Sequence, residues 1–541
     1  MNHIELFAGC GGLSLGLESA GFDLLLANEL SPMAAETFAY NHLNADLPSG
    51  KNVEKILWIS SSFPRSQMTS RLRENPEEAT GLGEHHFSDL LELEPKIEEL
   101  KRSLLVGSII DLNKILAQAT KKTPTSLLKL FQSGFGSGEV DLVSGGPPCQ
   151  SFSLAGMRQH SHRRNRLPGE FAKFVQLVKP KLVLLENVSG ILRPFKVGEK
   201  KKFAWFEVAK AFAREGYLPL CLHVNAKYVG AAQNRPRFIM IAVRKDIYLK
   251  YKKNSRNNDP LIDAFKGSET LIKELKKGNA SYGCLEYFDI NKYDSLFRNS
   301  LLSPLVSHKD PDASDNLLVS VKDAIDDLRE GSVSTSDYVH RLNNIFERHE
   351  NQPTNKHKNH ELRANSGRVR SRFRIYQIMN SLDKAEAKEV SNFLRTDGQS
   401  GICKPTLSAV SKFWLLGLDG IVIKKPSQDG VLRILKELYT KKQTQKALIA
   451  NAPAPAALSV ADDACHYHES KSSLRTLTVR EMARIQSFPD WYELRSKVTT
   501  GGQMRRFEVP QYTQVGNAVP PLLGLALGQV CRAFIEKANG S

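Results

Sequence analysis

The N-terminal half of the chain alternates short apolar runs with amphipathic segments, a pattern typical of a sheet of mainly parallel strands joined by helices. Most of the apolar runs end abruptly in glycines, prolines or a carboxylate, which is how buried strands meet the loops of an α/β protein. The runs that predict strands cover residues 4–7, 24–29, 109–112, 139–142, 180–188 and 238–243.

Helices are predicted where apolar residues recur at helical spacing. They cover residues 13–20, 171–178 and 477–486, the last with Thr478 as its expected N-cap, and an apolar C-terminal helix begins at Leu522. Residues 48–106 are less ordered in pattern and are interpreted as an insertion, with a charged helix expected over 90–105.

The pattern changes near residue 246, where charge rises and strands become short. We therefore predict a first domain over 1–245, a smaller irregular domain with a hinge over 246–507, and a segment over 508–541 that returns to the first. The middle region holds a basic and aromatic cluster that suits phosphate contacts, although a solvated helix face explains it as well. The cluster comprises Arg363, Arg368, Arg370, Arg372, Phe373, Arg374 and Tyr376.

Charge and cysteine content narrow the class of protein. The 541 residues include 75 Lys and Arg against 58 Asp and Glu, a net charge of +17 that fits a nucleic-acid partner or a basic solvated surface. No apolar run approaches the length of a membrane span, and the 7 cysteines are scattered, which favours the cytoplasm. Cys465, His466 and His468 lack a second ligand cluster, so no metal site is expected.

Two loops at strand ends suit a nucleoside cofactor. The glycine turn over 8–12 opens a helix, and Glu29 follows about 20 residues later, where such folds place a carboxylate on ribose hydroxyls. Asp111, at the end of the strand expected over 109–112, either contacts an adenine amine or caps the next helix.

A third loop holds the strongest candidate for catalysis. Gly145-Gly146-Pro147-Pro148 bends the chain sharply and places Cys149 at the apex, as a nucleophile or as a small buried residue. Glu186, at the end of the next predicted strand, would face the same edge of the sheet, and a helix cap or salt bridge is its alternative role. Arg235 and Arg237 project from one side of an extended segment and serve either an anionic ligand or these acids.

Taken in order, these segments resemble the motifs of the bacterial DNA cytosine-5 methyltransferases. The resemblance covers roughly the first 245 and the last 70 residues. It rests on Phe7-Ala8-Gly9-Cys10-Gly11-Gly12, Glu29, Asp111, Pro148-Cys149-Gln150, Glu186-Asn187-Val188, Gln233-x-Arg235-x-Arg237, the segment from Arg480 to Pro489, and Gln514-Val515-Gly516-Asn517.

This resemblance implies a Rossmann-like α/β catalytic domain that uses S-adenosylmethionine, with a target recognition domain in the variable middle. Cofactor contacts would come from Phe7, Gly9, Gly11, Gly12, Glu29, Asp111, Leu112, Pro148 and Asn517. By the same resemblance, the Cys149 thiolate adds to carbon 6 of a flipped cytosine, and Glu186 donates a proton or hydrogen bond to ring nitrogen 3. Arg237 would help to ionise the thiol, while Asn187 and Arg235 would orient Glu186 and the base.

The implied function is methylation of duplex DNA at one site by the protective enzyme of a restriction-modification system. The enzyme is expected to act as a monomer, sharing its target sequence with an endonuclease it need not touch. Three alternatives are a tRNA cytosine-5 methyltransferase, a catalytically silent DNA-binding protein and an oxidoreductase built on the glycine turn. The long middle region favours DNA over tRNA, and the intact Cys149, Glu186 and Arg237 disfavour a silent copy.

Overall fold

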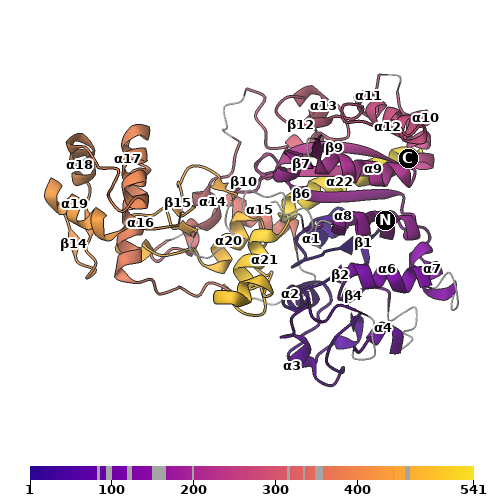
Figure 1. The fold of residues 1–541 in the computed structure, drawn as a ribbon, viewed down its shortest axis with the longest axis horizontal. Helices are drawn as coiled ribbons and strands as arrows, with labels where there is room; N and C mark the ends of the chain where they lie inside the picture. The colour runs from indigo at the N-terminus through magenta and orange to yellow at the C-terminus, as the bar shows by residue number, and fades with distance from the viewer. Residues whose placement is uncertain are drawn as a thin grey trace. The chain divides into compact units, whose positions relative to one another are not determined.

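The chain folds into two compact units, whose helices and strands are labelled in Figure 1. The first unit comprises Met1–Ala231, Arg235–Leu317 and Tyr492–Ser541, and the second comprises Ala232–Asn234 and Leu318–Trp491. The computed structural model describes residues 1–81, 86–92, 100–118, 125–148, 166–197, 200–256, 258–312, 317–332, 335–347, 357–442, 444–456 and 463–540.

A sheet of mainly parallel strands organises the first unit, as predicted. In the described residues its strand order is β12-β9-β11-β6-β5-β1-β2-β4-β3, and only β11 runs antiparallel to its neighbours. The strands are β1 (Asn2–Leu6), β2 (Asp23–Glu29), β3 (Ile56–Trp58), β4 (Ser103–Val106), β5 (Leu142–Gly145), β6 (Leu182–Val188), β9 (Tyr217–Asn225), β11 (Pro236–Arg244) and β12 (Tyr287–Asp289).

Helices cover the sheet and complete its core. One buried cluster joins the strands to α6 (Ile109–Gln118), α7 (Thr125–Gln132), α8 (Leu167–Val178), α9 (Ala204–Arg214) and α12 (Lys266–Lys276). A second cluster packs α2 (Pro32–His42) on β2, β3 and β4. The central strands are therefore buried along almost their whole length, including polar residues of β1 such as His3 and Glu5.

The C-terminal segment packs into this unit, as predicted. Helix α22 (Pro521–Asn539) lies along α1 (Gly12–Ser19) and α10 (Lys245–Asn254), and it follows the short helix α21 (Gln511–Asn517). Contrary to the sequence expectation, Gln511–Asn539 is long and apolar enough to cross a membrane. Most of its apolar window is buried inside the protein, as in the core helix of a globular unit.

Two local predictions were wrong. Residues 109–112, expected as a strand, form the first turn of α6, and the strand before it is β4. β4 also overlaps the end of the helix expected over 90–105. Because β4 pairs with β2 on one side and with β3 on the other, the interpreted insertion over 48–106 includes two strands of the sheet.

The unit boundaries also differ from the expected 245/246 and 507/508. The first unit extends to Leu317, because α10 packs on α22 and β12 adds to the sheet beside β9. It resumes at Tyr492, whose hydroxyl donates to the backbone carbonyl of Cys10. These contacts join segments that are far apart in the sequence, so the change in composition did not indicate them.

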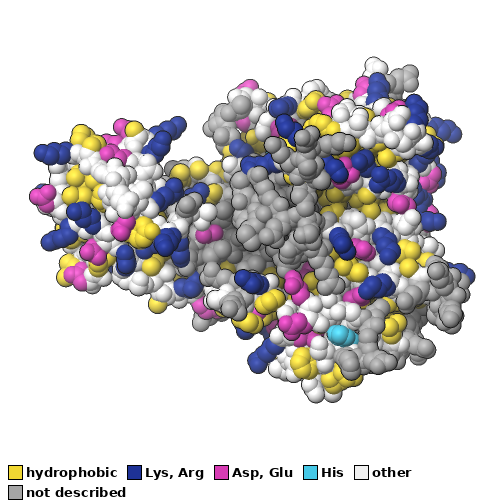
Figure 2. Space-filling view, viewed as in Figure 1, with side chains coloured by type: hydrophobic (Ala, Val, Ile, Leu, Met, Phe, Trp, Pro, Cys, Tyr) yellow, Lys and Arg dark blue, Asp and Glu magenta, His cyan; other side chains and the backbone are white. Residues whose placement is uncertain are grey.

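The second unit is mainly helical around a core of its own. The core residues come chiefly from α16 (Gly367–Met379), α17 (Lys384–Arg395), α18 (Lys404–Ser411) and α19 (Gln428–Glu437), with short strands including β13 (Leu415–Leu416) and β15 (Lys446–Ala447). Thr478 caps α20 (Val479–Ile485) as predicted, through a capping box with Glu481. Lys and Arg side chains, with Asp and Glu between them, are spread over the surface of this unit in Figure 2.

The basic and aromatic cluster on α16 is partly a core feature, which neither sequence interpretation anticipated. Arg374 is fully buried, donates to the carbonyl of Trp414 at 3.0 Å, and places its guanidinium 4.1 Å from the Trp414 ring centre. It also pairs with Glu469 at 3.0 Å, and Phe373 beside it is fully buried. This part of the cluster stabilises the second unit and is not available as an open phosphate-binding surface.

Candidate active site

Five loops meet at the carboxyl edge of the sheet in the first unit. They follow β1, β2, β4, β5 and β6, and the chain places β2 on one side of β1 and β5 on the other. Strand order thus reverses between β1 and β5, which is where open α/β sheets form a ligand crevice. The glycine turn follows β1 and Pro148 follows β5, while Glu29 ends β2 and Glu186 lies near the end of β6. Arg235 and Arg237 lie at the start of β11, and Asn517 ends α21.

The loop that precedes Cys149 packs directly against Glu186. A Cβ atom on Gly146 would lie 3.0 Å from Glu186 Oε2, so only glycine allows this approach without displacing the carboxylate. Asn187 Nδ2 donates to the Pro147 carbonyl at 2.9 Å, which ties the end of β6 to the same loop. Cys149 itself lies outside the described residues, so its role stays a prediction.

Glu186 forms a buried ion pair with Arg237. The two side chains are 11% and 10% exposed, and Arg237 Nε lies 2.6 Å from Glu186 Oε1. The antiparallel register places Ile239 opposite Glu186, so Arg237, two residues away, lies on the same face of the sheet. Burial lowers the pKa of Arg237, and the Glu186 carboxylate counteracts this effect. Of the two roles left open for this arginine, the structure shows the pairing with an acid.

Arg235 contacts the C-terminal segment. Its Nη2 donates to the carbonyls of Gly516 and Ala518, both at 2.9 Å, on either side of Asn517. Its side chain is almost fully buried, and this burial, together with the nearby Arg237, lowers its pKa. The described contacts therefore position the Asn517 turn, whereas the sequence interpretation gave Arg235 the task of orienting Glu186 and the base.

The glycine turn and Glu29 lie together, as their spacing predicted. The backbone N–H groups of Gly9 and Ser31 donate to the two oxygens of Glu29, each at 2.8 Å. Burial raises the pKa of Glu29, while these two hydrogen bonds counteract it. Phe7 and Gly9 adopt positive φ angles of 55° and 57°, and no described atom lies within 4 Å of a Cβ placed on Gly9. The turn thus leaves open space beside a fixed carboxylate, which fits the ribose of a nucleoside cofactor.

A hydrogen-bond network that the sequence analysis missed packs against this turn at Gly11. Gly11 has a φ of 89°, and a Cβ on it would lie 2.3 Å from His42 Nε2 and 2.6 Å from the Tyr492 hydroxyl. His42 contacts that hydroxyl at 3.0 Å and Glu18 at 2.7 Å. Tyr492 is 482 residues from Cys10, to whose carbonyl it donates, so no local pattern could indicate the contact.

Gln514 joins the C-terminal segment to the same region. Thr37 donates to its Oε1 at 2.6 Å, and its Nε2 donates to the carbonyls of Met33 and Val509 at 3.2 and 3.0 Å. Asn517, the last residue of α21, is exposed beyond this anchor. The motif containing these two residues is thereby held beside α2, next to the cofactor turn.

The positions of Asp111 and Leu112 differ from the sequence interpretation. Asp111 lies in the first turn of α6, where its carboxylate accepts hydrogen bonds from the Gly81 N–H and the Lys114 ammonium, both at 2.9 Å. Leu112 is fully buried in the core. The residues that directly follow β4 are Gly107 and Ser108, so Ser108 occupies the strand-end position that had been assigned to Asp111.

A second unforeseen network lies at the end of β6. Ser189 contacts His223 Nε2 at 2.9 Å, and His223 Nδ1 contacts Asp289 at 2.6 Å. Burial raises the pKa of Asp289, but hydrogen bonds from His223 and the Asn291 N–H outweigh it and lower the pKa overall. The network links β6, β9 and β12 just beyond Asn187. Its three residues are widely separated in sequence and match no motif.

Comparison with known proteins places these features in a family. The family model described as C-5 cytosine-specific DNA methylase matches residues 1–64 and 113–533. The chain belongs to this family. It is therefore a methyltransferase that uses S-adenosylmethionine, and the Rossmann-like fold class expected from the sequence is confirmed.

Two relatives of this methylase match it from end to end. The Type II methyltransferase M.DdeI of Desulfomicrobium norvegicum is 24% identical over 539 residues, covering 100% of this chain and 90% of the relative. The Type II methyltransferase M.Bpa9945I of Bacillus paralicheniformis is 25% identical over 564 residues, covering 99% of each chain.

Proposed function

We propose that this methylase modifies carbon 5 of a cytosine within one short sequence of duplex DNA, as the protective enzyme of a Type II restriction-modification system. The Type II names of the two full-length relatives support this role. The observation on which the proposal rests is the Glu186–Arg237 pair, buried at the carboxyl edge of the sheet and in contact with the loop that leads to Cys149.

In the proposed mechanism the Cys149 thiolate forms a bond to carbon 6 of the cytosine, and the negative charge spreads over the ring toward nitrogen 3. Glu186, protonated when the base is bound, donates a proton or hydrogen bond there. Because Arg237 holds Oε1 of Glu186, Oε2 is the oxygen we expect to face the base. Bound S-adenosylmethionine supplies an electrophilic methyl group. Carbon 5 would take that methyl group with S-adenosylhomocysteine as the leaving group. A base then removes the carbon 5 proton, and the bond between carbon 6 and the Cys149 sulfur breaks to release the thiolate.

The chain holds its cofactor with the turn after β1, which leaves open space at Gly9, and with Glu29, whose carboxylate the turn fixes. Phe7, Gly11, Gly12, Pro148 and Asn517 complete the proposed set. Asp111 and Leu112 are left out of it, because Asp111 is held by Gly81 and Lys114 and Leu112 is buried.

The second unit is proposed to recognise the target sequence, and the first to perform catalysis. Carbon 5 cannot be reached inside a stacked duplex, so the target cytosine leaves the helix before it reacts. The enzyme acts as a monomer in the cytoplasm, and its cognate endonuclease shares the target sequence without a required contact.

Bisulfite sequencing of DNA from cells that express the protein tests this proposal. Full methylation at one short motif is expected, with none in the Cys149→Ser variant and normal methylation in Cys284→Ser, a control in the same unit. Purified wild-type protein should also form a covalent adduct with 5-fluorocytosine duplex DNA and cofactor. Unmethylated DNA together with methylated tRNA would replace this function by the tRNA alternative, and activity in Cys149→Ser would refute the mechanism.

A further inference from the structure

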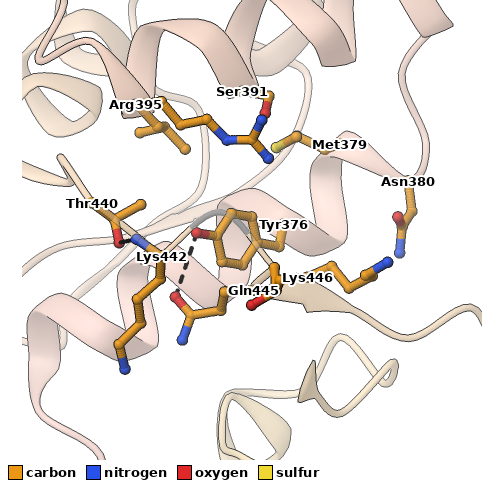
Figure 3. A pocket seen from close by; sticks show the side chains of 11 residues that line it. Tyr376, Met379, Asn380, Ser391, Arg395, Thr440, Lys442, Gln445 and Lys446 are labelled. Atoms are coloured by element: carbon orange, nitrogen blue, oxygen red, sulfur yellow. Dashed lines mark hydrogen bonds between the residues drawn. The ribbon is translucent and has the colours of Figure 1, made fainter. Parts of the chain in front are cut away.

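The second unit contains a pocket of about 370 Å³ to which the methylation chemistry assigns no role (Figure 3). One wall comes from α16 and α17, which contribute Tyr376 and Arg395. The other comes from the segment after α19 and from β15, with Thr440, Gln445 and two lysines. The volume is near the lower limit for ligand sites, and the polar lining suits a small charged group better than an apolar ligand.

The charge of the lining is one-sided. Arg395, Lys442 and Lys446 line the pocket, and its lining residues include no Asp or Glu. A fourth cation supports the wall from within. Arg372 is 8% exposed and its Nη1 donates to Thr440 Oγ1 at 3.0 Å and to Gln445 Oε1 at 3.4 Å. Burial lowers the pKa of Arg372, but a guanidinium remains protonated at neutral pH.

The polar wall is oriented to favour an anion. Gln445 Oε1 accepts from Arg372 and from the Tyr376 hydroxyl at 3.4 Å, and Thr440 Oγ1 accepts from the Lys442 N–H at 3.1 Å. These two side-chain oxygens are therefore already paired with protein donors, while Thr444 in the same wall donates to Asp463 at 3.0 Å. In addition, Arg372 Nε has no hydrogen-bond partner among the described residues.

We propose that this pocket binds a phosphate group through Arg395, Lys442 and Lys446. Phosphate matches a lining that carries positive charge and charged hydrogen-bond donors. The group comes either from the backbone of the DNA substrate or from a free nucleotide. The first source rests on the proposed function, because it requires that the enzyme bind DNA, whereas the second does not.

Titration of the purified full-length protein with inorganic phosphate and with cytidine monophosphate, at constant ionic strength, tests the site directly. Arg395→Gln should weaken phosphate binding by about tenfold or more, as expected for the loss of a charged hydrogen bond. Lys388→Gln is the matched control, because it removes an exposed cation from the same helix outside the pocket and should leave the affinity unchanged. Equal phosphate affinity in Arg395→Gln, Lys442→Gln and wild type would overturn the proposal.

The salt dependence of DNA binding distinguishes the two sources. If a backbone phosphate enters the pocket, the Lys442→Gln/Lys446→Gln variant should lower the slope of log K against log salt by about 0.9, the value for one phosphate. An unchanged slope with weakened nucleotide binding supports the free ligand. If each lysine substitution alone lowers this slope by about 0.9, and both together lower it by about 1.8, the two lysines contact two separate phosphates on the surface. That result would overturn the proposal of a single phosphate site in the pocket. Because phosphate binding is measured without DNA, the result for the phosphate site does not depend on the result of the methylation tests.

Discussion

Replacing Glu186 by Gln separates the chemical role of this residue from its structural one. The substitution keeps the size of the side chain and removes the charge that faces Arg237. Since the two side chains are only 11% and 10% exposed at a separation of 2.6 Å, removing one partner costs up to about 3–5 kcal/mol. The proposed proton donation accounts for a further effect, a fall in rate of about 10²- to 10⁴-fold.

Single-turnover methyl transfer to duplex DNA measures the chemical effect. Amide hydrogen exchange at β6 and β11, the strands that hold the two residues, measures the stability effect. The control is Glu139→Gln, the same change in an exposed pair with Arg244 at 3.1 Å, which should alter stability by no more than about 1 kcal/mol.

A double variant makes the test decisive. In Glu186→Gln/Arg237→Gln the Arg237 charge is removed together with its partner, so protection of β6 should recover relative to Glu186→Gln while the methylation rate stays low. Recovery of the rate together with stability would show that Glu186 acts only through folding. A rate within tenfold of wild type in Glu186→Gln would equally refute the proposed proton donation.

Three further predictions concern the cofactor turn and its supports. Gly11→Ala should weaken S-adenosylmethionine binding by at least about tenfold in a titration, because the added Cβ meets His42 Nε2 at 2.3 Å; unchanged affinity would show that the turn can relax. Arg235→Lys should increase hydrogen exchange over 511–521, since one ammonium cannot reproduce the two bonds to the carbonyls beside Asn517; equal protection would contradict this anchor. Burial raises the pKa of Glu5 to about 8, so the folded state holds a proton that the unfolded state loses from about pH 4.5. This proton contributes its full stability below about pH 4.5, and the contribution is lost as the pH rises to about 8. Glu5→Gln should therefore flatten the plot of the free energy of unfolding in urea against pH over that range. Parallel plots for the variant and the wild type would exclude this linkage.

Much of the fold could be predicted because its signals are local. The runs that became β2, β6 and β11 are apolar over their central residues, since a sheet covered on both faces buries the side chains of both. Glu29 and the glycine turn were correctly associated, because their spacing follows from one strand–helix–strand unit. The errors occurred where a short apolar run did not distinguish strand from helix, as at 109–112.

The sequence by itself determined the order of the motifs and the family to which the chain belongs. Only the tertiary structure decided the partner of each charged side chain. Arg235 and Arg237 are two residues apart, yet one binds carbonyls 281 and 283 residues away and the other pairs with Glu186. Local sequence specifies backbone conformation and burial, whereas the partner of a buried charge depends on which distant segments the packed core brings within hydrogen-bonding distance.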